Sequence, residues 1–423
     1  MKLVLLCTGV MMIVLDTTIV TVALPSMQTD LHLSNTSLTW VLNAYLLSYG
    51  GFLLVSGRLG DLYGQRRLFL VGIAIFAIAS LVCGLAASAW VMLAARAVQG
   101  LGGAVVSAVS LALIMNLFTE ASARARALGF YGFVCAAGGC LGELLGGVLT
   151  GALGWHWIFL VNVPVGVAVY VASLFYLPCD SATVRVQQSE ARLQQPLIPL
   201  RLFESRNFTI ASVIGVLWTA GTFTWFVVSA LYLQQVLSYD PFRVGLAFLP
   251  AQLIMALFSG GLSAKVVMRF GILRPLWLGL LLATAGLLLF ARAPVRGAFV
   301  VDVLPCMLLL GLGAGLMSTP LLLAAMNDVG SEDSGLASGI VNTAFLMGGA
   351  LGLAVLASVA EIRTDLLLQS GGGSLVALNG GYQFAFLAAA VLTAIGAALG
   401  AFRLAPDVDA QNRHPHFAPR RGR

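Results

Sequence analysis

A short charged segment reads Gly57-Arg58-Leu59-Gly60-Asp61-Leu62-Tyr63-Gly64-Gln65-Arg66-Arg67, with glycines three and four residues apart. It lies between two long apolar stretches in a chain of which only 9% is Asp, Glu, Lys or Arg and 59% is hydrophobic. Soluble domains carry about 25% charged residues, so this chain has too few charged side chains to cover a surface exposed to water. The composition therefore indicates an integral membrane protein.

Twelve apolar runs approach the roughly 20 residues that a helix needs to cross a bilayer. They lie near residues 3–25, 40–57, 68–87, 90–115, 127–152, 155–177, 207–233, 244–264, 275–291, 299–325, 335–360 and 380–402. The run at 275–291 is the shortest and is bounded by Arg274 and Arg292. Unpaired backbone groups are not tolerated in hydrocarbon, so we expect an all-α protein with twelve transmembrane helices.

The basic residues of the connecting segments predict the orientation. If the N-terminus lies inside, most of the 23 Lys and Arg residues fall on the inner side. Arg96 lies within a helix, and the outer side carries Arg243, Arg292, Arg296 and Arg363. This bias predicts that both termini are cytoplasmic. It also accounts for the net charge of +6 without a nucleic-acid partner.

The chain divides into two sets of six runs. We expect an N-terminal six-helix bundle at 1–177, a polar cytoplasmic linker at 178–206, a C-terminal six-helix bundle at 207–404 and a basic cytoplasmic tail at 405–423, which can contact anionic lipid. Ala264 to Gly271, after the eighth run, echoes Gly57 to Gly64, although Met268 replaces the acid. Such an echo is typical of an internal repeat.

Four motifs resemble those of a known family. The 57–67 segment is similar to the signature between helices two and three of the major facilitator superfamily. The stretches Leu15 to Pro25, Arg96 to Gly103 and Gly335 to Thr343 resemble first-, fourth- and eleventh-helix motifs of its drug:proton antiporters, in particular of the group that usually has fourteen helices. The resemblance implies two bundles that rock around a midplane cavity and export a hydrophobic or amphipathic compound in exchange for protons.

The chain also departs from that pattern. The group usually has two more helices in the middle, where this chain has only the 178–206 linker. Glu143 stands where the glycine-rich fifth-helix motif has a proline, and Phe345 and Leu346 stand where an arginine–glutamine pair is usual. These differences leave the expected fold intact and the coupling mechanism open.

Three ionisable residues lie well inside the apolar runs: Asp16, Arg96 and Glu143. At 1.5 Å per residue, each lies roughly 10–13 Å below the outer end of its helix. Charge inside a membrane costs about 2.5–3.5 kcal/mol on insertion scales, so it usually faces a cavity or a partner. Our hypothesis is that Arg96 pairs with one acid while the other carries the coupling proton, with Asp16 favoured. The alternative is that Asp16 only bonds neighbouring helices and Glu143 fills a gap in glycine-rich packing.

The 57–67 segment suggests gating. Asp61 would face the N-terminus of helix eleven near Ser334, where the helix dipole favours a carboxylate. Gly57, Gly60 and Gly64 would allow close approach, and Arg66 would latch the same contact. The alternative is a basic loop that only fixes the topology. The glycines at 138–147 are expected to form a packing face between the halves, or to serve packing alone.

For the substrate cavity we expect Tyr45, Trp218, Trp225 and Asn342. Aromatic surfaces suit varied hydrophobic ligands, but core or lipid-facing roles are commoner for such residues. Candidate substrates are antibiotics, drugs and secreted metabolites.

Other functions stay open, namely uptake or facilitated diffusion of one metabolite, or a sensor or scaffold that does not transport. The sequence shows no catalytic residues, nucleotide-binding loop or metal-ligand spacing, which argues against an enzyme. We expect a monomer in the plasma membrane, with protons as the coupling ion and no other cofactor.

Overall fold

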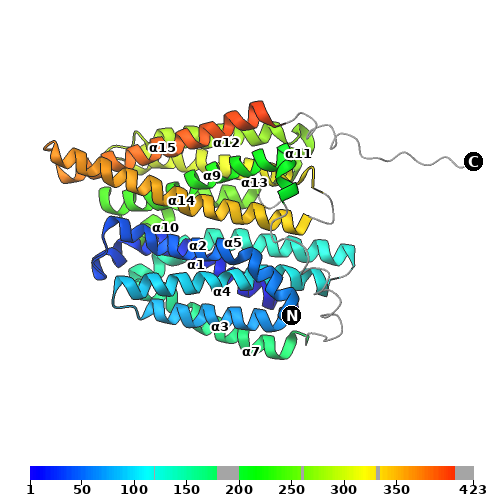
Figure 1. Ribbon diagram of the computed structural model, residues 1–423. Coiled ribbons are helices and arrows are strands. Elements are labelled where there is room, and N and C mark those ends of the chain that lie inside the picture. Colours follow the sequence, from blue (N-terminus) through cyan, green and yellow to red (C-terminus); the bar gives the residue numbers. More distant parts are fainter. Residues whose placement is uncertain (119, 179–199, 259–261, 330–333, 405–423) are drawn as a thin grey trace, which may run out of the picture.

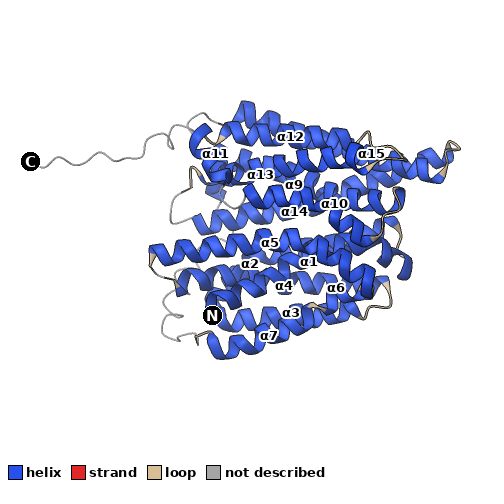
Figure 2. Ribbon diagram, turned by 180° about the vertical axis from the view of Figure 1, so that it is seen from behind, coloured by secondary structure: helices blue, strands red, loops and turns tan. Residues whose placement is uncertain are grey.

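The computed structural model describes residues 1–118, 120–178, 200–258, 262–329 and 334–404, and all regular elements in these ranges are helices (Figure 2). This confirms the expected all-α fold class. The first part of the chain forms α1 (Lys2–Asp30), α2 (Asn35–Tyr63), α3 (Gln65–Gly84), α4 (Ala89–Leu117), α5 (Ala121–Leu153), α6 (His156–Leu160) and α7 (Asn162–Tyr176). The second forms η1 (Leu200–Glu204), α9 (Arg206–Leu231), η2 (Tyr232–Val236), α10 (Pro241–Leu257), α11 (Ser263–Phe270), α12 (Leu273–Phe290), η4 (Phe299–Val303), α13 (Leu304–Met326), α14 (Ser334–Gln369) and α15 (Ser374–Arg403).

Eleven helices in the described ranges are long and apolar enough to cross a bilayer. Three of them are composite: α6 continues into α7, α9 into η2, and η4 into α13. The shortest expected run becomes α12, with 18 residues. The run expected at 244–264 forms a helix of only 17 residues, α10. It begins early because Asp240 accepts a hydrogen bond from the Arg243 backbone N–H and Pro241 occupies the first turn.

The two halves of the chain repeat one packing pattern. In the N-terminal half, α1 packs on α5, α4 on both α2 and α3, and α3 on α7. In the C-terminal half, α9 packs on α14, α13 on both α10 and α12, and α12 on α15. Each pairing therefore recurs six spans later, as an internal repeat requires. Figure 1 shows the halves as two stacked groups of helices.

The halves meet along two helix pairs, α2 with α14 and α5 with α10. Backbones approach closely along the second pair, because a Cβ on Gly147 would lie 2.5 Å from the Pro241 carbonyl oxygen, and one on Gly245 would lie 2.8 Å from that of Glu143. The other glycines of the 138–147 run behave differently. Gly138, Gly142 and Gly146 contact α1, inside the N-terminal half. Thus Gly147 alone among these four supports the expected packing face between the halves.

The start of α1 and the end of α15 lie at one end of the molecule, here called the terminal end (Figure 1). The opposite end, where α1 finishes, is called the far end. There η2, a π-helical continuation of α9, bonds to the other half: Gln234 Nε2 donates to the Val22 carbonyl at 3.0 Å, and Gln235 Nε2 to Gln28 Oε1 at 3.0 Å. These bonds hold the two halves together at the far end.

The α14–α15 hairpin projects beyond the other helices at the far end (Figure 1). α14 has 36 residues, so it is about 54 Å long at 1.5 Å per residue. A bilayer core is about 30 Å thick, so α14 is much longer than a span requires. The predicted linker and tail fall largely on 179–199 and 405–423, which lie outside the described residues.

Candidate proton and substrate site

Asp16 and Arg96 form a fully buried ion pair inside the N-terminal half. Arg96 Nη1 lies 2.5 Å from Asp16 Oδ2, and neither side chain is exposed. Arg96 Nε donates to the Val41 carbonyl oxygen at 2.9 Å, and its guanidinium lies 4.3 Å from the centre of the Tyr45 ring. The pair thus joins α1, α2 and α4. The sequence hypothesis that Arg96 pairs with one acid agrees with this geometry, and that acid is Asp16.

Two amides complete the shell around the Asp16 carboxylate. Gln99 Nε2 donates to Asp16 Oδ1 at 2.9 Å, and Asn162 Nδ2 donates to the same oxygen at 3.1 Å. Gln99 Nε2 also lies 2.7 Å from Ser80 Oγ, and Gln99 Oε1 accepts from Arg96 Nη1 at 2.7 Å. Three side chains therefore donate to one carboxylate, and five spans meet at the cluster. Such a buried charge is well compensated, because it has both an opposite charge and hydrogen bonds.

The sequence reasoning did not single out Gln99 or Asn162. Gln99 was one position of the fourth-helix motif and lies three residues after Arg96, so the two share a helix face. Asn162 is a lone amide at the start of α7. A polar residue inside an apolar span, at the depth of a buried charge, was the signal available for both.

Glu143 lies apart from this cluster, where α5 meets α10. Its side chain is 1% exposed, and Oε2 accepts a hydrogen bond from Gln252 Nε2 at 3.0 Å. Among the described residues Oε1 has no hydrogen-bond partner, and the acid has no ion pair. The donor belongs to the other half of the chain. Glu143 is thus an almost uncompensated buried acid between the two halves.

Asp16 and Glu143 share a depth but occupy separate sites. Gly142 packs against Thr18 and the Leu15 carbonyl oxygen, which puts Glu143 level with the Asp16 turn of α1. Leu15 and Thr18 face α5, whereas Asp16 points toward α4 and α7. The structure therefore does not bring the three predicted ionisable residues together in one cluster.

The predicted gating loop is mostly helix. Residues 57–63 form the last two turns of α2, and the chain turns only at Gly64, which has a positive φ of 98°. The helix continues through this segment because, in apolar surroundings, backbone groups must keep their hydrogen bonds within the helix. Gly60 contacts Val109 of α4, while a Cβ on Gly57 would meet nothing within 4 Å.

Of the two residues expected to form the latch, the structure describes the side-chain contact of Arg66 but not that of Asp61. Arg66 Nη2 donates to the Leu174 carbonyl oxygen of α7 at 2.6 Å, a contact within its own half. Helix α14 does begin at Ser334. The side chain of Asp61 lies outside the described residues, so its contact with α14 stays a prediction.

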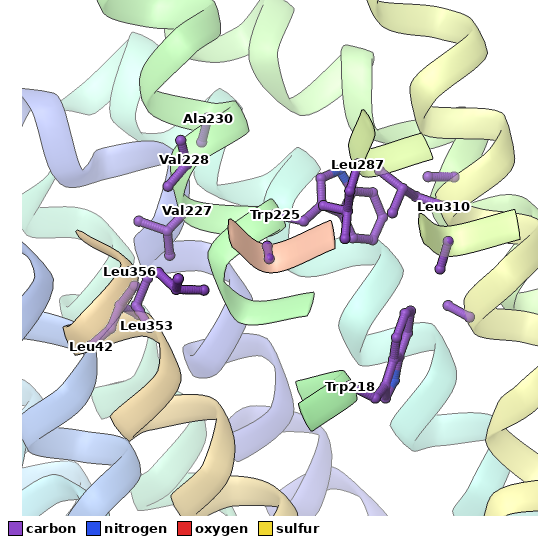
Figure 3. Close-up of a cluster of buried hydrophobic side chains, with 14 of the residues drawn as sticks. Leu42, Trp218, Trp225, Val227, Val228, Ala230, Leu287, Leu310, Leu353 and Leu356 are labelled. Atoms are coloured by element: carbon purple, nitrogen blue, oxygen red, sulfur yellow. The ribbon is translucent and has the colours of Figure 1, made fainter. Parts of the chain in front are cut away.

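The four expected substrate residues lie in three places. Tyr45 is buried against Arg96, and its ring stacks on Tyr49 with centroids 5.8 Å apart. Trp218 and Trp225 belong to a cluster of buried apolar side chains that extends through the C-terminal half (Figure 3). Asn342 is exposed on α14. The structure therefore does not group the four residues in one place, and their contact with substrate stays a prediction.

Comparisons with known proteins agree on one family. Residues 6–353 match the family model described as Major Facilitator Superfamily. The chain is 34% identical to a puromycin resistance protein of Streptomyces alboniger, with 88% of this chain and 84% of the relative aligned. It is also 34% identical to a cephamycin export protein of Amycolatopsis lactamdurans, with 92% and 89% aligned. A bacterial homologue of the human lysosomal transporter Spinster, in an inward-facing and occupied conformation, has a similar fold, with a TM-score of 0.77, 18% identity and 98% of both chains covered.

Proposed function

This chain belongs to the Major Facilitator Superfamily, and we propose that it exports antibiotic-like small molecules in exchange for protons. The observation that carries export is its similarity, over more than four fifths of the chain, to proteins named for puromycin resistance and cephamycin export. Puromycin and cephamycin are chemically unlike antibiotics, so the similarity supports a class of cargo rather than one compound. The substrate class we propose is therefore amphipathic compounds of antibiotic size.

Proton coupling is supported by the two buried acids. A carrier of protons needs a carboxyl that can be neutral in one state and ionised in another. Asp16 and Glu143 are buried at the same depth, and Arg96 compensates only Asp16. Two acids and one basic residue leave one carboxyl for the proton. Protons are the only coupling ion we propose, with no other cofactor.

Alternating access follows from the way in which the halves meet. Each half is a packed unit, and the contacts between them are concentrated in α2 with α14 and α5 with α10. Rocking about these pairs would expose the space between the halves first at one end and then at the other. The Gln234 and Gln235 bonds keep the far end closed in this structure. The Asp61 latch to α14 remains part of the proposal for the terminal end.

We place the protein in the plasma membrane as a monomer, with the terminal end in the cytoplasm. The apolar spans make it a multi-pass membrane protein. The bias of Lys and Arg toward the segments at the terminal end supports the orientation. Export then runs from the terminal end to the far end.

The proposal is tested by export from cells that express the chain. Cells would be loaded with puromycin, with a cephamycin-type β-lactam, or with a fluorescent lipophilic cation, and efflux would be measured with and without a protonophore. We expect export of at least one compound, and its loss when the protonophore is added. Export that persists with the protonophore would contradict proton coupling. The absence of export for every compound would contradict the substrate class.

A further inference from the structure

Glu143 differs from the other buried charges because its environment is shared between the two halves. The carboxyl sits on α5, while Gln252, its hydrogen-bond donor among the described residues, sits on α10. The α5 and α10 backbones touch nearby, since Gly245 contacts the Glu143 carbonyl and Gly147 contacts Pro241. When the halves move relative to each other, this environment must change.

The described residues around Glu143 supply no counter-charge. Helix α5 packs on α10, α1, α6 and α4. Arg243, the ionisable residue of α10, is exposed in the first turn and pairs with Asp240 at 3.2 Å. Asp16 and Arg96 pair with each other. The remaining ionisable side chains of α1 and α6 are Lys2, Cys7, Asp30 and His156, and none of them has an ion pair or hydrogen bond with Glu143 among the described residues.

A carboxyl in this place is compatible with the closed interface only in its neutral form. One neutral amide does not compensate a charge that has been removed from water. Loss of the proton from the Glu143 carboxyl to water leaves a carboxylate that has to be hydrated. Water reaches the carboxyl only if α5 and α10 separate, because the glycine contacts close the interface around it.

We propose that Glu143 binds the transported proton, and that loss of this proton opens the α5–α10 interface. The proposal rests on the proposed function, because it assigns the proton site of that exchange. The closed form binds the proton and the open form releases it, so proton binding and the position of the halves are thermodynamically linked. Gln252 is a positioning residue that holds the protonated carboxyl across the interface.

The geometry also separates Glu143 from Asp16. The Asp16 partners Arg96, Gln99 and Asn162 all belong to the N-terminal half. In the rocking motion proposed above this half moves as one packed unit, which leaves the Asp16 environment unchanged. Protonation of Asp16 would also leave Arg96 as an unpaired buried charge. In this proposal Asp16 is a fixed structural charge, in contrast to the role of proton carrier for which the sequence favoured it.

The test measures the position of the halves without any substrate. Full-length protein in lipid nanodiscs would carry spin labels on keto amino acids, which leave the native cysteines in place. One pair, at Leu153 and Val300, reports on the far end, and a second pair, at Tyr63 and Met268, reports on the terminal end. All four side chains are exposed, whereas Glu143 is buried. Distances between the labels would be measured from acidic to alkaline pH.

In the unmutated protein we expect one of the two distances to lengthen as the pH rises. Glu143→Gln should abolish this change and keep the distances of the closed form, because glutamine stays neutral and can still accept the Gln252 bond. Glu143→Asp should restore the response. Glu204→Gln, the same chemical change at an exposed acid of η1, should leave it intact.

Two results would overturn the proposal: a Glu143→Gln protein that responds like the unmutated one, or an unmutated protein without a pH response. Acidic-pH distances that match those of the unmutated protein show that the variant is folded. Since no cargo is present, failure of the export assay would contradict the proposed function and leave this result standing.

Discussion

Asp16 and Glu143 are two buried acids at one depth with opposite surroundings. Asp16 has a cationic partner and two amide donors, all from its own half. Within the described part of the chain, Glu143 has one amide donor, from the other half. A buried charge with a complete set of partners stabilises one arrangement of helices, whereas a half-satisfied acid at a moving interface makes that arrangement depend on protonation. In our proposal, the number of partners and the half that supplies them, rather than burial, separate a structural charge from a switch.

The strongest challenge to this comparison is Arg96→Met. Removal of the guanidinium leaves the Asp16 carboxylate buried with only amide donors, and breaking a buried pair in this way typically costs about 3–5 kcal/mol. We expect a loss of that size in the free energy of unfolding, measured by denaturant titration in mixed micelles. Arg96→Lys, which keeps the charge, should lose less. A loss below that of the amide variant described next would contradict the structural role of the pair.

A smaller effect is expected when one donor is removed. Asn162→Leu takes away a hydrogen bond to a charged group, which contributes about 1.5–3 kcal/mol. The same titration should show a loss in that range, with export retained if the protein is folded. Asn207→Leu, which removes a bond to Asp328 at 2.9 Å in a part-buried site of the other half, is a matched control. If the control loses as much free energy of unfolding or more, the Asp16 cluster stabilises the protein no more than an ordinary part-buried hydrogen bond.

The substitution Gly147→Val tests the contact between α5 and α10 by adding a larger side chain at their interface. A valine there meets the Pro241 carbonyl oxygen at 2.5 Å, and overpacking typically costs about 1–3 kcal/mol. We expect the closed far end to be destabilised by this amount, seen as a longer Leu153–Val300 label distance at acidic pH. Gly151→Val, with nothing within 4 Å of its Cβ, should leave the distance unchanged. The same distance in both variants would show that this contact does not close the interface.

The smallest change in stability is expected for Glu143→Gln. The side chain keeps its volume and its acceptor for Gln252 and loses only the ionisable proton, so the free energy of unfolding at acidic pH should shift by less than about 1 kcal/mol. The proton-driven component of export should nevertheless be lost. A loss of stability as large as that of Arg96→Met would place Glu143 with the structural charges.

The sequence predicted the features that depend on composition and period. Apolar runs predicted the spans, and the requirement for a partner predicted that Arg96 would pair with an acid. The sequence did not predict which of the two acids pairs with Arg96. That choice depends on the directions in which Asp16 and Glu143 face, and these depend on helix packing. The face of Glu143 depends on the packing of α5, with Gly142 on α1 and Gly147 on α10. Only the three-dimensional packing shows that Gly142 contacts α1 whereas Gly147 contacts α10.

Two other features could not be predicted from the sequence: the helical conformation of residues 57–63 and the position of Gln252 opposite Glu143. Charge and glycine content suggested a loop at 57–67, but glycine in a helix costs only about 1 kcal/mol, which helix packing overcomes as far as Tyr63. The position of Gln252 opposite Glu143 requires the register of α10. That register depends on the cap at Asp240, twelve residues before Gln252, whereas the apolar run in the sequence begins only at 244.

The long α14–α15 hairpin gives this molecule a natural place for a tag. Its turn contains Gly371, which has a positive φ of 86°. Residues 370–376 are all exposed. Inserted residues at such an exposed turn disturb few contacts. A short epitope placed there would be bound by an antibody on intact cells if the far end is extracellular, and only after permeabilisation if it is cytoplasmic. The same projection that exceeds the needs of a membrane span would thus report which way the protein is inserted.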